Sequence, residues 1–260
     1  MMLVDSHCHL EYEGLADRQD EVLDRAREAG VGAFLNISTR REEWEAVTRT
    51  ANARDGVWAS VGIHPHNADD HVGLTLEDLI EATRNERVIG IGETGLDYHY
   101  DHSDRAAQRD LFRMHIEASR RTGLPLIIHT RDAEEDTLAI LAEETASGCF
   151  PALIHCFTAS PEFGHSVLEL GLSISISGIV TFKNATGLQD FARTIPAERL
   201  LIETDSPFLA PVPHRGKVCE PAFVGDTAAF LAALRTESPE ELGRYTTDNF
   251  FRLFAKARRG

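Results

Sequence analysis

The sequence is poor in cysteine and has no long apolar run. Its four cysteines, Cys8, Cys149, Cys156 and Cys219, are scattered and form no CxxC pair, which argues against a zinc ribbon or a disulfide framework. The apolar stretches fall short of the ~20 residues of a membrane helix. The N-terminus lacks the basic region and apolar core of a signal peptide. We therefore expect a soluble, cytoplasmic protein that makes no membrane contact.

Positive charge is also scarce. The 260 residues contain 26 Lys and Arg against 42 Asp and Glu, so the formal net charge is -16. Such a chain repels a polyanion at long range, which argues against an extended nucleic-acid footprint. Any anionic substrate must then be held by a few local cations.

Eight short apolar runs rich in β-branched residues recur along the chain and predict strands. They are "LVDSHCHL", "GAFLNIS", "VWASVGIHP", "VIGIGETGLD", "LPLIIHTRD", "FPALIHCF", "LSISISGIV" and "LLIETDSPF". Segments of helical period lie between them, such as residues 18–30 and 42–56, which both end at a glycine. This alternation predicts an α/β protein built as a single (β/α)₈ TIM barrel, spanning residues 1–260 as one domain.

A doubly wound open sheet is the alternative. It is disfavoured because no GxGxxG or GxxxxGK[ST] loop follows any of these runs. After the eighth run, residues 219–257 predict two C-terminal helices, the second beginning at "SPEE" with a capping serine and a first-turn proline.

Ionisable side chains recur at the carboxyl ends of the predicted strands. The first run places two histidines one residue apart, so both imidazoles point to the same face. The full set is His7, His9, His64, Glu93, His129, His155 and Asp205. The carboxyl ends of barrel strands form the mouth where active-site groups converge. Histidine and carboxylate ligands without thiolate suit Mg²⁺, Mn²⁺ or Zn²⁺, and seven candidates are too many for one tetrahedral ion. We therefore expect two divalent metal ions, Mg²⁺ being favoured, with Glu93 bridging them.

Several motifs in order resemble the TatD family of metal-dependent deoxyribonucleases, a branch of the amidohydrolase-like barrels. They are "DSHCHLE", "SVGIHPH", "IGETGLDY", "QRDLFRMHIEASRRTGLPLIIHTRDA", "HCFTAS", "SGIVTFKNA" and "LIETDSPFLAP" followed by "RGK". The resemblance covers residues 4–254. One departure lies after the eighth strand, where relatives often show "RGKRNEP" and this chain has "RGKVCEP", with Val218 and Cys219 in place of Arg and Asn.

The resemblance implies two ligand sets that share one carboxylate. The first metal would be held by His7, His9, Glu93 and Asp205, and the second by Glu93, His129 and His155.

Other residues at the mouth have expected roles in catalysis or substrate binding. Asp205 is the expected general base as well as a ligand, and Glu203 would orient the attacking water or a histidine, or serve a structural role deeper in the barrel. His64 and His66 would contact the phosphate or protonate the leaving oxygen. Loop cations would bind substrate phosphates, namely Arg131, Lys183, Arg215 and Lys217. We expect the remaining histidines, among them His71 and His115, to be solvated or to lie on helix surfaces.

Three functions remain open on these grounds. The resemblance favours a nuclease that trims 3′ ends of single-stranded DNA, or RNA, with nucleic-acid ends as its partner and no obligate protein partner. A hydrolase of esters or amides, such as a D-aminoacyl-tRNA deacylase, is the alternative, because the same centre polarises carbonyls. A binding protein without catalysis is the least favoured. The close spacing of strands and helices predicts short loops around the mouth.

Overall fold

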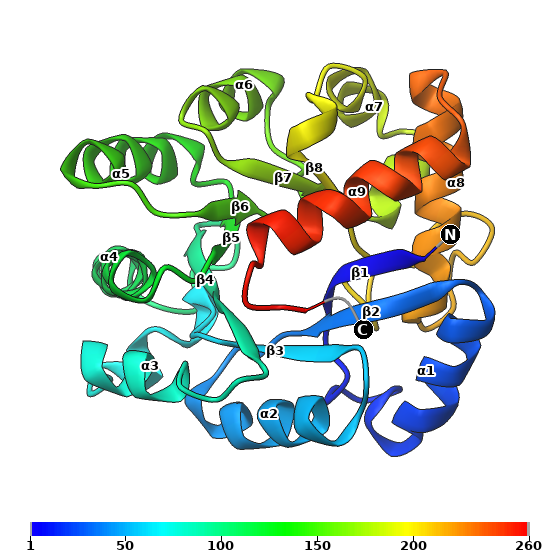
Figure 1. Ribbon diagram of the computed structural model, residues 1–260. Helices are drawn as coiled ribbons and strands as arrows, with labels where there is room; N and C mark the ends of the chain where they lie inside the picture. The colour runs from blue at the N-terminus through cyan, green and yellow to red at the C-terminus, as the bar shows by residue number, and fades with distance from the viewer. Residues whose placement is uncertain (1, 259–260) are drawn as a thin grey trace.

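The computed structural model describes residues 2–258, and within them eight parallel strands follow one another around a barrel (Figure 1). The sheet order is the chain order. The strands are β1 (Leu3–Cys8), β2 (Val31–Asn36), β3 (Val57–Val61), β4 (Val88–Asp97), β5 (Leu126–Arg131), β6 (Ala152–Ile154), β7 (Ser173–Ile176) and β8 (Leu200–Ile202). The predicted (β/α)₈ fold is confirmed.

The barrel closes where the last strand meets the first. Just beyond β8, the backbone N–H of Asp205 donates to the carbonyl of His7 at 2.9 Å. The N–H of His9 in turn donates to the carbonyl of Ser206 at 2.8 Å. These bonds place Asp205 beside the two N-terminal histidines, although nearly 200 residues of chain separate them.

Helices cover the outside of the barrel in the order that the sequence pattern predicts. They are α1 (Gln19–Glu28), α2 (Trp44–Ala53), α3 (Leu76–Ala82), α4 (Arg105–Thr122), α5 (Glu134–Ser147), α6 (Pro161–Glu169), α7 (Thr186–Ala192), α8 (Val224–Arg235) and α9 (Pro239–Leu253). Both predicted C-terminal helices are present. The Ser238 hydroxyl accepts a hydrogen bond from the N–H of Glu241, which caps α9.

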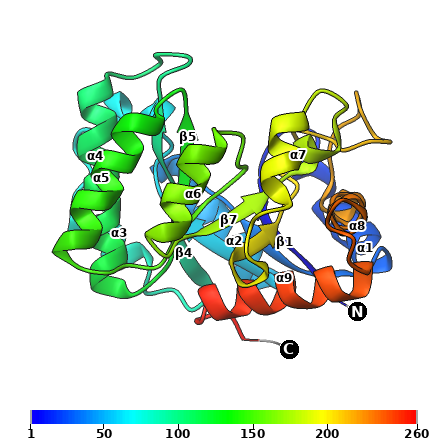
Figure 2. The same ribbon diagram turned by 90° about the horizontal axis from the view of Figure 1, so that it is seen from above.

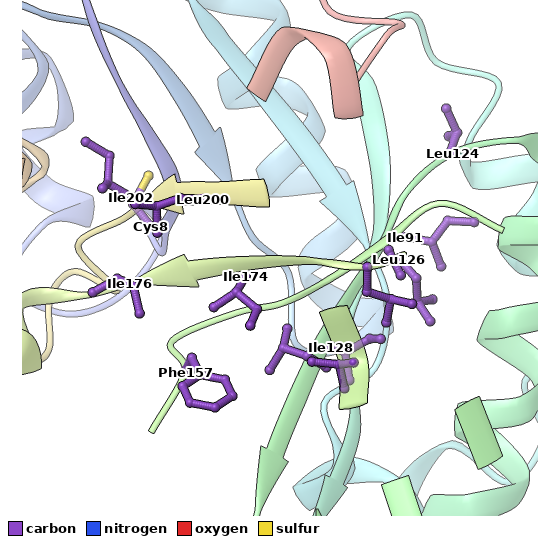
Figure 3. Close-up of a cluster of buried hydrophobic side chains, with 14 of the residues drawn as sticks. Cys8, Ile91, Leu124, Leu126, Ile128, Phe157, Ile174, Ile176, Leu200 and Ile202 are labelled. Carbon is purple, nitrogen blue, oxygen red and sulfur yellow. The ribbon is translucent and has the colours of Figure 1, made fainter. Parts of the chain in front are cut away.

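The core has two parts. Apolar side chains between the strands and the outer helices form the larger part, including Ile128, Phe157 and Ile174 (Figure 3). The smaller part fills the barrel interior and meets Phe250 and Phe254 at the end of α9. α9 lies across the amino-terminal end of the barrel (Figures 1 and 2). The carboxyl end of the strands is therefore the open end. No helix within residues 2–258 is long and apolar enough to cross a membrane.

Two histidines expected on the surface are instead buried. His115 on α4 accepts a hydrogen bond from the N–H of Ile63 at its Nε2 atom, at 3.1 Å, and its Nδ1 lies 2.8 Å from the carbonyl of Leu111. His71 is buried as well, with Nδ1 2.8 Å from the carbonyl of Asn67. The prediction of solvated rings is wrong for both, because backbone groups satisfy the ring nitrogens.

Two connections at the open end are also longer than predicted. The segment 62–75 between β3 and α3 contains the 3₁₀ helices η3 (Pro65–Asn67) and η4 (Asp69–His71). The segment 203–223 separates β8 from α8 and contains η7 (Pro221–Phe223). In Figure 2 this second loop stands beside α7, with α3, α4 and α5 on the opposite side of the barrel.

Candidate metal centre

The side chains predicted at the strand ends meet in one cavity at the open end of the barrel. The cavity has a volume of about 720 Å³. Its walls include six of the seven predicted strand-end residues, namely His9, His64, Glu93, His129, His155 and Asp205. The seventh, His7, lies directly beneath and is fully buried. β6 and β8 end one and three residues before His155 and Asp205, so these two side chains stand just past the strands.

Glu93 is the centre of the cluster, and its two carboxylate oxygens face different groups of histidines. Oε1 lies 2.8 Å from Nε2 of His155, 3.2 Å from Nδ1 of His129 and 3.4 Å from Nε2 of His64. Oε2 lies 3.2 Å from Nε2 of His7 and 3.9 Å from Nε2 of His9. One carboxylate therefore joins donors from both sides of the cavity.

A glycine permits the local path of β4 at this point. Gly92 has φ +140°, and a Cβ atom there would lie 2.6 Å from the carbonyl oxygen of Ile127. A larger residue would push β4 away from β5, which carries His129. The "GE" pair of the motif thus combines close strand packing with the central carboxylate.

His7, His9 and Asp205 form a second group of converging donors. The Nε2 atoms of the two histidines are 3.2 Å apart, and they lie 3.6 Å and 3.4 Å from Oδ1 of Asp205. The opposite ring atoms, Nδ1 of His7 and Nδ1 of His9, are buried without a hydrogen-bond partner among residues 2–258.

A second layer of carboxylates supports these donors. Asp97 Oδ2 lies 2.9 Å from Nε2 of His129 and 2.9 Å from Nε2 of His66. Glu203 Oε1 lies 3.3 Å from Nδ1 of His155, and the Ser175 hydroxyl donates to its other oxygen. Carboxylates behind ligating histidines fix the ring orientation and raise the basicity of the ligand.

The protonation equilibria follow from burial and from this dense packing of charges. Burial opposes ionisation of Glu93, but the charges of His155 and His64 and a hydrogen bond from His129 outweigh it and hold the pKa of Glu93 well below its usual range. For Asp205, burial is likewise outweighed, by a hydrogen bond from His9 and the charge of His7, so its pKa is lowered. Burial also opposes protonation of His155, but Glu93 and Glu203 raise its pKa well above the usual value. Both carboxylates are thus ionised at neutral pH, as metal ligands must be.

The donors present fit a divalent metal. Three groups bring ligand atoms within 4.8 Å of one another, namely His7, Glu93 and His155; His7, His9 and Asp205; and His64, Glu93 and His129. Nε2 of His155 is buried and lacks a hydrogen-bond partner among the described residues, although an acidic oxygen lies close by. Buried imidazole nitrogens of this kind are costly unless an ion or a proton occupies them.

The predicted catalytic and substrate-binding residues lie in three places: in the cavity wall, buried behind it, and on loops outside it. His64 and His66 line the cavity with Arg131, whereas Glu203 is fully buried behind His155 and does not line the cavity. Lys183 and Arg215 are exposed outside the cavity, on the loops after β7 and β8.

Some lining residues escaped prediction from the sequence. Asp97 could have been found, because it lies on the same strand as Glu93 and ends the quoted "ETGLD" run. Four further residues line the cavity from loops, namely Arg40, Tyr12, Tyr100 and Phe208. No pattern in the sequence predicts that their side chains lie there.

A closed (β/α)₈ barrel with a histidine and carboxylate cluster at its carboxyl end defines the class of metal-dependent barrel hydrolases. The chain belongs to the TatD family: the family model described as "TatD related DNase" matches residues 4–255.

Individual relatives agree with this assignment. The chain is 47% identical over 257 residues to YcfH of Escherichia coli K12, named an uncharacterized metal-dependent hydrolase, with 98% of this chain and 96% of that protein covered. It is 34% identical over 260 residues to a protein of Erwinia billingiae named 3′-5′ ssDNA/RNA exonuclease TatD, covering 97% and 98% of the two chains. Among solved structures, the TatD homolog YjjV of Escherichia coli K12 superposes with a TM-score of 0.91 at 27% identity, covering 97% of this chain and 98% of that one. The chain is therefore a metal-dependent hydrolase of this family.

Proposed function

We propose that the protein trims the 3′ ends of single-stranded DNA, or RNA, by hydrolysing phosphodiester bonds with two divalent metal ions, Mg²⁺ being the favoured one. The observation that carries this proposal is that the cations on the loops at the open end of the barrel have no carboxylate partner. Arg40, Arg131, Lys183, Arg215 and Lys217 pair with no carboxylate among residues 2–258. Most arginines on the outer helices, by contrast, are ion-paired, as Arg113 is with Glu143 and Glu144. A strongly acidic protein that leaves Arg40 and Arg131 unpaired in the wall of the cavity that holds the metal-ligand cluster is suited to a phosphate-bearing substrate.

The two carboxylate oxygens of Glu93, which face different groups of histidines, support the proposal of two metals. His7, His9 and Asp205 would hold one ion with Glu93, and His129 and His155 would hold the other with the same carboxylate. Bound divalent ions would polarise the phosphodiester and lower the pKa of an attacking water.

The chain's own groups supply the remaining steps. Asp205, an ionised carboxylate on the cavity wall, would accept the proton of the attacking water. Nδ1 of His64 accepts a hydrogen bond from the N–H of His66 at 3.1 Å, so the neutral ring carries its proton on Nε2. Nε2 lies 3.4 Å from Oε1 of Glu93 on the cavity wall, and its N–H would donate to a phosphate or leaving-group oxygen. Arg40 and Arg131 line the same cavity and would bind the phosphate's other oxygens.

The test compares two substrates on one preparation, purified without chelator or affinity tag. Single-stranded DNA labelled at its 5′ end should shorten stepwise from its 3′ end, and chelator should stop the reaction. A charged D-aminoacyl-tRNA, incubated in parallel, should keep its ester bond. Deacylation without shortening of the DNA would support the ester hydrolase instead. Metal binding without either reaction would favour the binding protein.

A further inference from the structure

The charges around the cavity differ from one side to the other. The loops after β3 and β4 carry exposed carboxylates, namely Asp69, Asp70, Asp101 and Asp104. In the segments that follow β7 and β8, the stretches 177–185 and 206–219 contain no Asp or Glu. Of the acidic residues that flank the second stretch, Asp205 belongs to the metal-ligand cluster and Glu220 is paired with Arg18 and Arg25. The two stretches carry three of the unpaired cations, Lys183, Arg215 and Lys217. A chain of phosphates leaving the cavity would thus be repelled on one side and attracted on the other.

The two acid-free stretches form one continuous surface. The N–H of Val212 donates to the hydroxyl of Thr181 at 2.9 Å, which joins the loop after β8 to the loop after β7. The guanidinium of Arg215 lies over the ring of Phe182, with Cζ 3.7 Å from the ring centroid. Lys183 directly follows Phe182 in the chain. The stacked Arg215 is held in place without a carboxylate, so its charge stays available to an external anion.

An aromatic side chain connects this surface to the cavity. Phe208 lines the cavity, yet it is 49% exposed, and it lies at the start of the same loop that carries Arg215. Its ring meets the ring of Tyr12 edge to face, with the centroids 6.0 Å apart. Exposed aromatic rings beside unpaired cations are the arrangement by which proteins bind single strands, because bases stack on the rings while cations follow the backbone.

We infer that the substrate strand leaves the cavity over the loops after β7 and β8, a surface we call the β7–β8 track and define by Phe208, Phe182, Lys183, Arg215 and Lys217. This inference rests on the proposed function and adds the direction of the strand. The terminal nucleotide occupies the cavity, a preceding base stacks on Phe208, and the next phosphates lie against Arg215 and Lys183. Val218, which follows Lys217, is exposed and adds no charge to the track.

Binding of uncleavable single strands tests the track separately from hydrolysis. Fluorescein-labelled oligothymidylates with phosphorothioate linkages, two and twelve nucleotides long, are titrated with wild-type protein and anisotropy is recorded. The wild type should bind the 12-mer more tightly than the dimer. In the double variant Lys183→Ala with Arg215→Ala, the ratio of 12-mer to dimer affinity should fall about tenfold. The salt slope for the 12-mer should decrease by about 0.7 for each phosphate that the variant no longer neutralises.

Two control variants test the direction in which the strand leaves the cavity. Arg244→Ala removes a charge from α9, at the closed end of the barrel, and should leave the affinity ratio within twofold of wild type. Asp101→Asn with Asp104→Asn removes two charges from the opposite side of the mouth and should change the ratio less than the track variant does. An unchanged ratio in the track variant, or a wild type that binds both lengths equally, would overturn the track. Absence of hydrolysis in the wild type, with the expected binding pattern intact, would overturn the nuclease proposal and leave the track standing.

Discussion

Asp97 Oδ2 lies 2.9 Å from Nε2 of His129, on the side of the ring opposite Glu93. The carboxylate fixes which nitrogen of His129 faces the cavity, since the ring can present only Nδ1 to the cluster while Nε2 is bound. Asp97 is almost fully buried, and hydrogen bonds from His129 and His66 outweigh the effect of burial and lower its pKa. Asp97 is thus a positioning residue for two histidines at once.

Asp97→Asn should therefore weaken metal binding without removing a ligand. An amide is uncharged and a weaker acceptor, so His129 loses basicity and orientation, and we expect affinity to fall by about 10- to 100-fold at one site. Calorimetric metal titration measures this. Asp136→Asn, at a partly buried carboxylate on α5 that pairs with Arg109 and does not line the cavity, is the control, and it should titrate like wild type.

Glu93→Gln should reduce occupancy of both metal positions, because each carboxylate oxygen faces a separate group of histidines. His155→Ala, the matched comparison, should empty mainly one. Metal content after dialysis against a defined metal concentration distinguishes them. Two sites of unchanged affinity in the Glu93 variant would remove the bridging assignment.

Asp205→Asn should leave the barrel folded and lower turnover by about 10² to 10⁴-fold, because an amide cannot accept the proton of the attacking water. Circular dichroism checks the fold, and metal titration separates loss of a base from loss of a ligand. If the variant binds both metals and still turns over at the wild-type rate, Asp205 has no catalytic role.

His115 makes the stability of the fold depend on pH. Burial lowers its pKa to about 4, whereas the unfolded chain takes up this proton below about pH 6.5. The unfolded state binds more protons between these values, so the free energy of unfolding falls as pH drops through this window. The contribution is about 3 kcal/mol, complete above about pH 6.5 and lost near pH 4.

His115→Gln keeps an acceptor for the N–H of Ile63 and removes the titration. Urea unfolding at pH 7 and pH 4 should show a smaller loss of stability in this variant than in wild type. Equal losses in the two proteins would show that His115 does not titrate differently on folding.

The sequence could predict the barrel and the central cluster because both depend on local periodicity. His129 and Ile127 share a strand face, and all the predicted ligands except Glu93 lie within two residues of the carboxyl end of a strand or just past it, where barrel geometry brings such residues together. Glu93, also expected at a strand end, lies four residues before the end of β4, because this strand continues to Asp97. The burial of His115 depends on the N–H of Ile63, 52 residues away, and no local pattern carries that information. The position of Arg215 could not be predicted for the same reason. It depends on contacts of the loop after β8 with Thr181 and Phe182, whereas the loop sequence shows only that this loop is basic.

The central claim, metal-dependent trimming of single-stranded ends, is tested most directly with two forms of one DNA. Covalently closed circular single-stranded DNA and the same sequence linearised are incubated with the protein at fixed Mg²⁺, and release of mononucleotides is followed. If the cavity of about 720 Å³ admits a terminal nucleotide, as the account requires, the protein should process the linear form and leave the circle intact. Equal rates of cleavage on the two forms would contradict this account.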